Sequence, residues 1–156
     1  MTSSPKKSSR KLAANRRALH DFEVLERLEA GVALCGTEVK SVKNAQSSLA
    51  GAYARVEHGA VLLYGFTIQP YVHGNRFNHD PERPKRLLLH RAEIHKLQAQ
   101  IEQKGCAVVP LSVYLKRGLV KIEIGVCKGK RQSDKRETLR RKTAEREAER
   151  AIARAR

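Results

Sequence analysis

Two neighbouring runs of alternating apolar and polar residues constrain the fold of this chain more than any other feature. The run 119–126 has a branched aliphatic residue at every second position, and the run 107–116 alternates in a similar way. A side-chain period of two predicts half-buried β-strands. Arg117 and Gly118 separate the two runs, a spacing typical of a tight hairpin. We therefore expect a fold built on antiparallel β-structure.

Shorter elements surround this hairpin. Strand candidates are found at residues 22–25, 32–34, 52–57, 60–68 and 86–89. The segment 91–104 carries an aliphatic stripe at helical spacing and stops at Gly105, which predicts a helix; a shorter helix is expected over 37–45. The segment 70–84 holds three of the five prolines and is expected to be a loop.

Several short antiparallel strands, two helices and few aromatic residues together predict a mainly β fold with flanking helices. The chain has only four Tyr and three Phe and no Trp, so its core is expected to consist of Leu, Val, Ile and Ala. An OB-fold antiparallel β-barrel fits this set of elements, and it is a frequent nucleic-acid-binding architecture, although fold alone does not establish function.

The positive charge is concentrated at the two ends of the chain. Lys and Arg number 32 against 16 Asp and Glu, a net charge of +16, and residues 1–17 and 130–156 each contribute +6. Such a charge calls for an anionic partner; a nucleic acid is the commonest, and an acidic membrane surface is the alternative. No run approaches the ~18 apolar residues of a membrane span, and no signal-peptide core is present. We expect a cytosolic, cytoplasmic protein.

The charge distribution divides the chain into three regions. Residues 1–13 are rich in Ser, Lys and Arg and are expected to form a disordered basic arm. Residues 14–129 are expected to form the RNA-binding domain, followed by a basic tail over 130–156. From Thr138 onward the tail consists largely of helix formers, but its apolar face is mostly Ala and buries little area. We expect a tail poised between coil and helix that a partner orders; the alternative is a merely solvated helix.

Enzymatic and metal-binding chemistry find little support. His79, within the segment 78–81, is the only candidate base, but Asp80 before Pro81 is typical of a structural turn. His90 and His95 are five residues apart, so they lie on different helix faces. The cysteines have no CxxC spacing and are expected to be isolated thiols: Cys35, Cys106 and Cys127. We expect no catalytic residue, cofactor or metal.

Short motifs follow one another in a fixed order over most of the chain. They are Asn15–Ala18 with His20–Asp21, Glu29–Gly31, Gly36–Ser41, Asn78–Pro81 leading into Leu87–Leu89, Val109–Leu111, and Gly129–Arg131 with Asp134–Arg136. In this order and spacing the chain resembles the small protein B (SmpB) family, the SsrA-binding proteins that accompany transfer-messenger RNA in bacterial ribosome rescue.

The resemblance implies an OB-fold barrel, one face of which binds the tRNA-like domain of transfer-messenger RNA around its D-loop and elbow. The residues it implies for this RNA surface are Asn15, Arg16, His20, Glu29, Gly31, Lys40, Lys43 and Leu88. A carboxylate such as that of Glu29 can accept hydrogen bonds from base amino and imino groups. The protein is expected to be a monomer that carries out no chemistry itself.

The resemblance also gives the tail a role. In this family the tail lies in the decoding region of the stalled ribosome, beside 16S rRNA, becomes helical and stands in for the missing codon–anticodon pairing. Elongation factor Tu is implied as an indirect partner through the charged RNA. The tail residues concerned are Gly129, Lys130, Arg131, Asp134, Lys135 and Arg136.

The chain departs from the family pattern at three places. Phe22 stands where Tyr is common, Gly51 and Ala52 replace Asp and Ser, and Ser133 cannot stack on a decoding-centre base as a planar side chain would. Two other functions remain open on the sequence alone. One is a structural ribosomal protein with basic extensions, and the other is an RNA-modifying enzyme in which His79 serves as the base.

Overall fold

A computed structural model describes residues 10–73, 78–129 and 132–155. Its central element is the predicted hairpin of β8 (Ala107–Lys116) and β9 (Leu119–Gly129), whose antiparallel register runs from Ala107 opposite Cys127 to Lys116 opposite Leu119. Arg117 and Gly118 both adopt left-handed backbone angles, with φ of 53° and 78°, as a two-residue hairpin turn with right-handed strand twist requires.

The strand β2 (Phe22–Val32) pairs with β9 from Phe22 opposite Gly129 to Gly31 opposite Lys121. The strand predicted at 22–25 is confirmed as the start of β2, which continues to Val32 as one strand of 11 residues. Of the strand predicted at 32–34 only Val32 belongs to β2, so that separate strand was wrong. Charged residues from Glu26 to Glu29 interrupt the apolar pattern in the sequence. Each of these residues nevertheless has a register partner in β9, from Glu26 opposite Val126 to Glu29 opposite Glu123, so pairing overrides the local signal.

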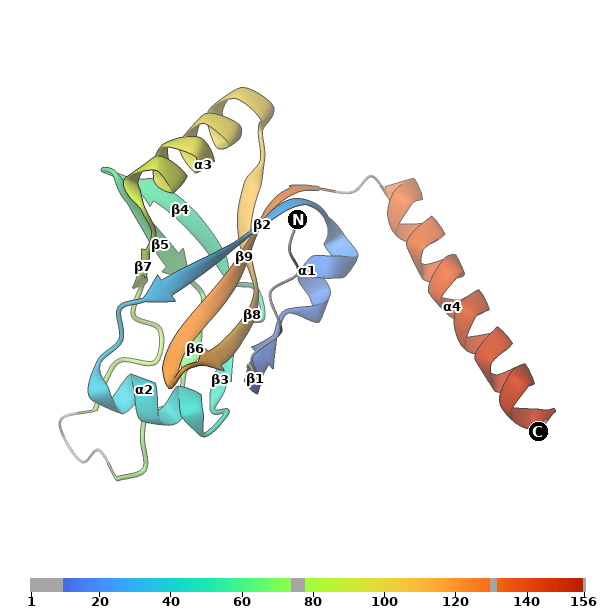
Figure 1. Ribbon diagram of the computed structural model, residues 1–156, viewed down its shortest axis with the longest axis horizontal. Coiled ribbons are helices and arrows are strands. Elements are labelled where there is room, and N and C mark those ends of the chain that lie inside the picture. The colour runs from blue at the N-terminus through green and yellow to red at the C-terminus, as the bar shows by residue number, and fades with distance from the viewer. Residues whose placement is uncertain (1–9, 74–77, 130–131, 156) are drawn as a thin grey trace.

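The sheet closes on itself. Its strands follow the order β1-β8-β4-β5-β7-β2-β9, and the additional pairing of β8 with β9 completes a ring (Figure 1). The other strands of the ring are β4 (Tyr53–Glu57), β5 (Ala60–Tyr64) and β7 (Lys85–Leu88), and β1 (Arg10–Ala14) pairs with β8 at the end of the strand order. A separate pair is formed by β3 (Ser47–Ser48) and β6 (Thr67–Ile68). The predicted mainly β fold with flanking helices is confirmed.

Two predicted boundaries in the strands need correction. Residues 10–13 were expected to belong to a disordered arm, but they form β1, which pairs with residues 112–115 of β8; residues 1–9 lie outside the described part. The strand predicted over 60–68 is divided into β5 and β6 at Gly65, whose φ is +77°. A Cβ at Gly65 would lie 3.1 Å from the Cα of Ala52, so the close approach of the two segments requires glycine.

Helices flank the strands at several points (Figure 1). They are α1 (Arg16–Asp21), α2 (Gly36–Lys43), α3 (Arg91–Lys104) and α4 (Gln132–Arg154). The bounds of α3 are those predicted, and Gly105 ends it in the left-handed conformation. The helix α1 was not predicted, because six residues are too few to show a helical period. The tail forms α4, which contacts α1 and projects from the body.

The core lies inside the ring and consists mainly of aliphatic side chains from opposite strands, as expected. Val61 and Leu63 of β5 and Ile122 and Ile124 of β9 are fully buried, and Leu97 seals the core from α3. A smaller cluster lies under α1 and joins Ala18 to Val109, Leu111 and Cys127, with Phe22 packed against it. These contacts fix the position of α1 beside the hairpin.

Candidate nucleic-acid interface

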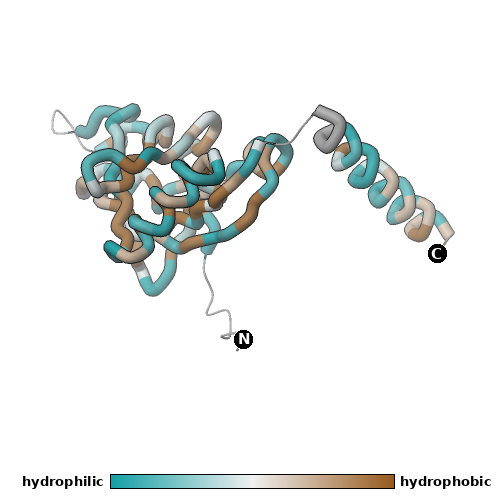
Figure 2. The backbone as a smooth tube through the Cα atoms, turned by 90° about the horizontal axis from the view of Figure 1, so that it is seen from above, coloured by the Kyte–Doolittle hydropathy of each residue, from teal (hydrophilic) through white to brown (hydrophobic). Residues whose placement is uncertain are grey.

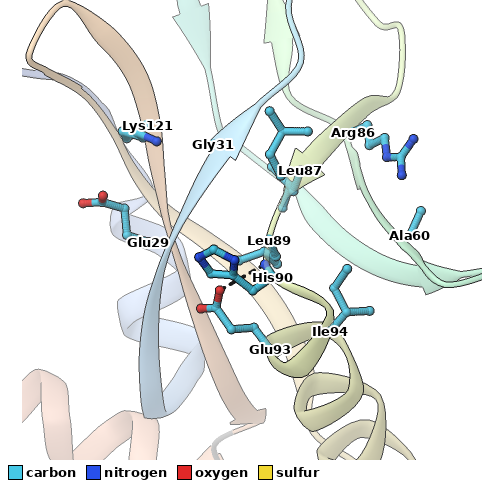
Figure 3. A pocket seen from close by; sticks show the side chains of 11 residues that line it. Glu29, Gly31, Ala60, Arg86, Leu87, Leu89, His90, Glu93, Ile94 and Lys121 are labelled. Atoms are coloured by element: carbon cyan, nitrogen blue, oxygen red, sulfur yellow. Dashed lines mark hydrogen bonds between the residues drawn. The ribbon is translucent and has the colours of Figure 1, made fainter.

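Strand register brings three of the predicted site residues to one place. Gly31 of β2 pairs with Leu88 of β7 on one side and with Lys121 of β9 on the other. Glu29 lies two residues before Gly31 and therefore on the same face of β2. Glu29, Gly31, Leu88 and Lys121 contribute to the lining of a pocket of about 430 Å³ that also involves Arg86 and the start of α3 (Figure 3).

Gly31 keeps this pocket open. A Cβ on Gly31 would lie 3.2 Å from the Cβ of Leu88 and 3.7 Å from the Nζ of Lys121. A larger side chain would therefore fill the space between these two neighbours. Leu88 remains 54% exposed although it is apolar, so the pocket combines an accessible apolar surface with a cation on either side, Lys121 and Arg86.

The Glu29 carboxylate is held in place by donors from β8. The hydroxyl of Tyr114 donates a hydrogen bond to it, and the Nζ of Lys116 lies 3.2 Å from Oε1. The Tyr114 bond lowers the pKa of the Glu29 carboxyl, against an opposing effect of burial and with a further contribution from Lys116. Burial and the same bond raise the pKa of Tyr114. Glu29 is thus a charged, oriented acceptor that is still 39% exposed.

Three other predicted residues lie on or beside α1, and the side chain of one of them, Asn15, is buried. Asn15 is only 5% exposed. Its Oδ1 accepts from the backbone N–H of Ala18 at 3.2 Å, and its Nδ2 donates to the carbonyl of Pro110 at 3.0 Å. Asn15 therefore caps α1 and ties it to β8, and its side chain does not face solvent as the expected RNA contact requires.

The neighbours of Asn15 are better placed for a ligand. Arg16 is exposed. His20 is half-buried, and its Nδ1 lies 3.0 Å from Oδ1 of Asp21. Since α1 precedes β2, these residues lie near the end of the strand opposite to Gly31 (Figure 1).

The predicted lysines Lys40 and Lys43 are exposed on α2, which follows β2 at its other end. The Nζ of Lys40 lies 5.3 Å from the ring centroid of Tyr71, a cation–π contact. Neither Lys40 nor Lys43 lines the pocket that contains Glu29 and Leu88. The predicted RNA residues are thus distributed over α1, the middle of the sheet and α2.

An ion pair between the buried Glu38 and the partly exposed Arg83 anchors α2. The Oε1 of Glu38 accepts from Arg83 at 2.6 Å and from the backbone N–H of Cys35 at 2.8 Å. Burial raises the pKa of the Glu38 carboxyl, but the bonds from Arg83 and Cys35 outweigh it and lower the pKa overall. Nearby, the fully buried Lys85 donates to the carbonyls of Phe66 and Pro81, and burial lowers the pKa of its ammonium group.

His79 has structural partners on both ring nitrogens. Its Nε2 lies 2.9 Å from the carbonyl oxygen of Ile68, and its Nδ1 lies 2.9 Å from the hydroxyl of Thr37. Since a carbonyl only accepts, the N–H at Nε2 donates to Ile68, and in the neutral ring Nδ1 accepts from the hydroxyl of Thr37. The adjacent Asn78 pairs with both backbone groups of Tyr71. This motif therefore fastens a loop to α2, which supports the structural interpretation over the catalytic one.

Within the described ranges no three His, Cys, Asp or Glu side chains come together as a possible metal site, and no helix there is long and apolar enough to cross a membrane. The three cysteines are free; Cys106 and Cys127 are buried, whereas Cys35 is exposed.

The tail residues are only partly described. Gly129 is the last residue of β9, and Arg136 is exposed on α4. Lys130 and Arg131 lie outside the described residues, as do the side chains of Ser133, Asp134 and Lys135. Hydrophilic residues predominate along α4 (Figure 2).

Three members of the site were not predicted from the sequence: Lys121, Tyr114 and Lys116. Their signal was present in the alternation of β8 and β9, which placed these residues on the polar side of each strand. The alternation could not tell which other strands would pair with β8 and β9 and so bring their polar side chains close to Glu29 and Leu88. Arg86 was missed for the same reason.

A model of the "SmpB protein" family matches residues 12–154 of this chain. The chain belongs to the SmpB family. Among the relatives of this family member, the SsrA-binding protein of Desulfitobacterium hafniense is 52% identical over 139 residues, which cover 89% of each chain. The SsrA-binding protein of Shouchella clausii is 50% identical over 141 residues, 90% of each chain.

A solved structure described as "tmRNA-SmpB: a journey to the center of the bacterial ribosome" is also similar. Its TM-score is 0.64 at 45% sequence identity, and the match covers 82% of this chain and 94% of the other. The structural similarity of this SmpB family member therefore covers most of both chains.

Proposed function

We propose that this SmpB family member binds the tRNA-like domain of transfer-messenger RNA (SsrA) and delivers it to stalled ribosomes for trans-translation. The observation that carries the proposal is the pocket in which Glu29, Gly31 and Leu88 meet Lys121. An oriented carboxylate can accept from base edges, an exposed apolar side chain can contact a base, and the cations can neutralise phosphates. Relatives named SsrA-binding protein, about half identical over most of the chain, support the choice of RNA.

The body of the protein is the RNA-holding part of this proposal. The ring formed by β8, β4, β5, β7, β2 and β9, with α3 packed across β4 and β8, supports an OB-type closed barrel. Arg16 and His20 at one end of β2 and Lys40 and Lys43 at the other would extend the contact along the RNA. Asn15 contributes by fixing α1.

The tail is the ribosome-sensing part. A long, exposed and basic α4 supports a segment that enters the empty messenger channel beside 16S rRNA, with Asp134, Lys135 and Arg136 near its start. In this proposal the ribosome carries out peptide transfer, elongation factor Tu acts indirectly through the charged RNA, and the protein is a monomeric, non-enzymatic adaptor in the cytoplasm.

The first experiment separates the body from the tail. A chain truncated after Gly129 is compared with the full chain in gel-shift titrations of transfer-messenger RNA and ordinary tRNA at two salt concentrations, and in a peptide-tagging assay on stalled ribosomes. The truncated chain is expected to bind the tRNA-like domain to within about threefold of the full chain, a difference of only ~0.6 kcal/mol, and to lose tagging. Full tagging by the truncated chain would contradict the tail mechanism.

A matched pair of substitutions refines this test. Arg136→Ala and Arg154→Ala each remove one exposed arginine from α4, at its start and at its end. Only Arg136→Ala is expected to reduce tagging. Equal effects would mean that the tail acts through its total charge, as expected for a structural ribosomal protein with basic extensions.

A further inference from the structure

A stacked pair of tyrosines lies on the outer face of β4 and β5. Tyr53 and Tyr64 are direct cross-strand partners, their ring centroids are 5.6 Å apart, and their planes differ by 18°. The guanidinium of Arg55 lies 5.6 Å from the ring centroid of Tyr53. Tyr53 remains 43% exposed. Tyr53 thus offers an accessible aromatic surface that the core does not use.

The stack is held in a fixed orientation. The hydroxyl of Tyr64 donates to both carboxylate oxygens of Glu57, at 3.0 and 3.1 Å. Because Glu57 and Tyr53 are on the same strand and the same face, this bond fixes Tyr64 relative to Tyr53. A pre-oriented aromatic surface loses little conformational entropy when a planar ligand stacks on it.

The register of the sheet connects this stack to the pocket already described. Arg55 of β4 pairs with Leu62 of β5, and Leu62 pairs with Arg86 of β7. The three side chains therefore form one row on the outer face, and Arg86 also lines the pocket. Leu88 follows two residues later on the same face of β7. The outer surface thus continues from Gly31 and Leu88 across Arg86 to Tyr53.

The charges along this surface suit a nucleic acid. Arg55 and Arg86 are both exposed, and among the described residues neither takes part in an ion pair. Two carboxylates lie near Tyr53 and Arg55: Glu57 accepts from Tyr64, and Glu102 of α3 accepts from Gln98. Aromatic rings and guanidinium planes stack on unpaired bases, and guanidinium groups also pair with phosphates. Two arginines beside an exposed tyrosine provide both kinds of contact.

We propose that Tyr53, Tyr64 and Arg55 form a stacking platform for an unpaired base of the RNA that occupies the pocket, with Arg86 holding the phosphate backbone between pocket and platform. This proposal rests on the proposed function, because it assigns the platform to the tRNA-like domain of transfer-messenger RNA. The continuity of the surface through Arg86 is the reason for assigning both contacts to one RNA.

The test uses the full chain and the isolated tRNA-like domain. Tyr53→Leu keeps an apolar contact with Tyr64 but removes the π surface, whereas Tyr53→Phe retains it. Because stacking contributes ~1–3 kcal/mol per base, Tyr53→Leu is expected to weaken binding at least fivefold. Tyr53→Phe is expected to stay within about twofold of the parent. Thermal unfolding of both variants confirms that the sheet is intact.

Salt dependence distinguishes stacking from charge. Arg86→Gln is expected to reduce the slope of log K against log salt by about one, whereas Tyr53→Leu is expected to lower affinity with the slope unchanged. Parent-like affinity of Tyr53→Leu would overturn the platform while leaving the proposed function intact. Failure of the parent protein to prefer the tRNA-like domain over ordinary tRNA would instead overturn the proposed function.

Discussion

Replacing Asn15 by Ala tests whether this residue acts through the fold or through RNA. The substitution removes the cap of α1, which costs about 1 kcal/mol in similar helices. It also leaves the buried carbonyl of Pro110 without its donor, which costs ~1–3 kcal/mol. The free energy of unfolding should therefore fall by about 2–4 kcal/mol. For a chain of this size that corresponds to a loss of roughly 5–15 °C in Tm.

The assay combines urea unfolding with RNA titration under conditions where each variant is fully folded. Asn15→Ser retains an acceptor for the N–H of Ala18 but loses the donor to Pro110, so its loss of stability should lie between those of the parent and Asn15→Ala. RNA affinity of the folded Asn15→Ala protein should stay within about threefold of the parent. An unchanged Tm together with a tenfold loss of affinity would refute the capping role and restore Asn15 as an RNA contact.

Two further predictions concern carboxylates. Glu29→Ala should weaken binding of the tRNA-like domain about tenfold, as expected for loss of a base-reading pair. Because Glu29 is 39% exposed, the free energy of unfolding should change by less than ~1 kcal/mol. A drop in Tm larger than this change implies would mean that Glu29 has a structural role. Glu38→Gln should lower the free energy of unfolding by about 1–3 kcal/mol at neutral pH. This loss is smaller than that expected for breaking a fully buried ion pair, because Arg83 is 37% exposed. Since the folded pKa of Glu38 lies below its ordinary value of 4.5, this stabilisation is present above that pH and is lost as the pH falls through the folded pKa. Urea unfolding at pH 7 and below pH 4 should show that the difference in free energy of unfolding between Glu38→Gln and the parent shrinks at the lower pH. A constant difference would contradict a stabilising ion pair between Glu38 and Arg83.

Local patterns predicted those elements in which neighbouring residues carry the signal. The hairpin of β8 and β9 could be predicted because alternation and turn residues are both local, and α3 because its stripe and Gly105 mark the helix and its end. The bounds of β2 could not, because residues 26–29 join the strand through hydrogen bonds with β9 rather than through their own preference. The same holds for β1, whose residues appeared in the sequence only as part of a basic arm.

The candidate site shows the same division at the level of single residues. The family resemblance identified Glu29, Gly31 and Leu88, together with basic residues such as Lys40, as candidate RNA contacts. The composition located the excess of positive charge at both ends of the chain. Only the tertiary structure shows that the side chain of Asn15 is buried and that Lys121 and Arg86 lie on either side of Leu88. The same holds for Arg55 and Tyr53, which continue that surface. The physical reason is that strand register joins residues far apart in the chain, and no local pattern specifies which strand edges will pair.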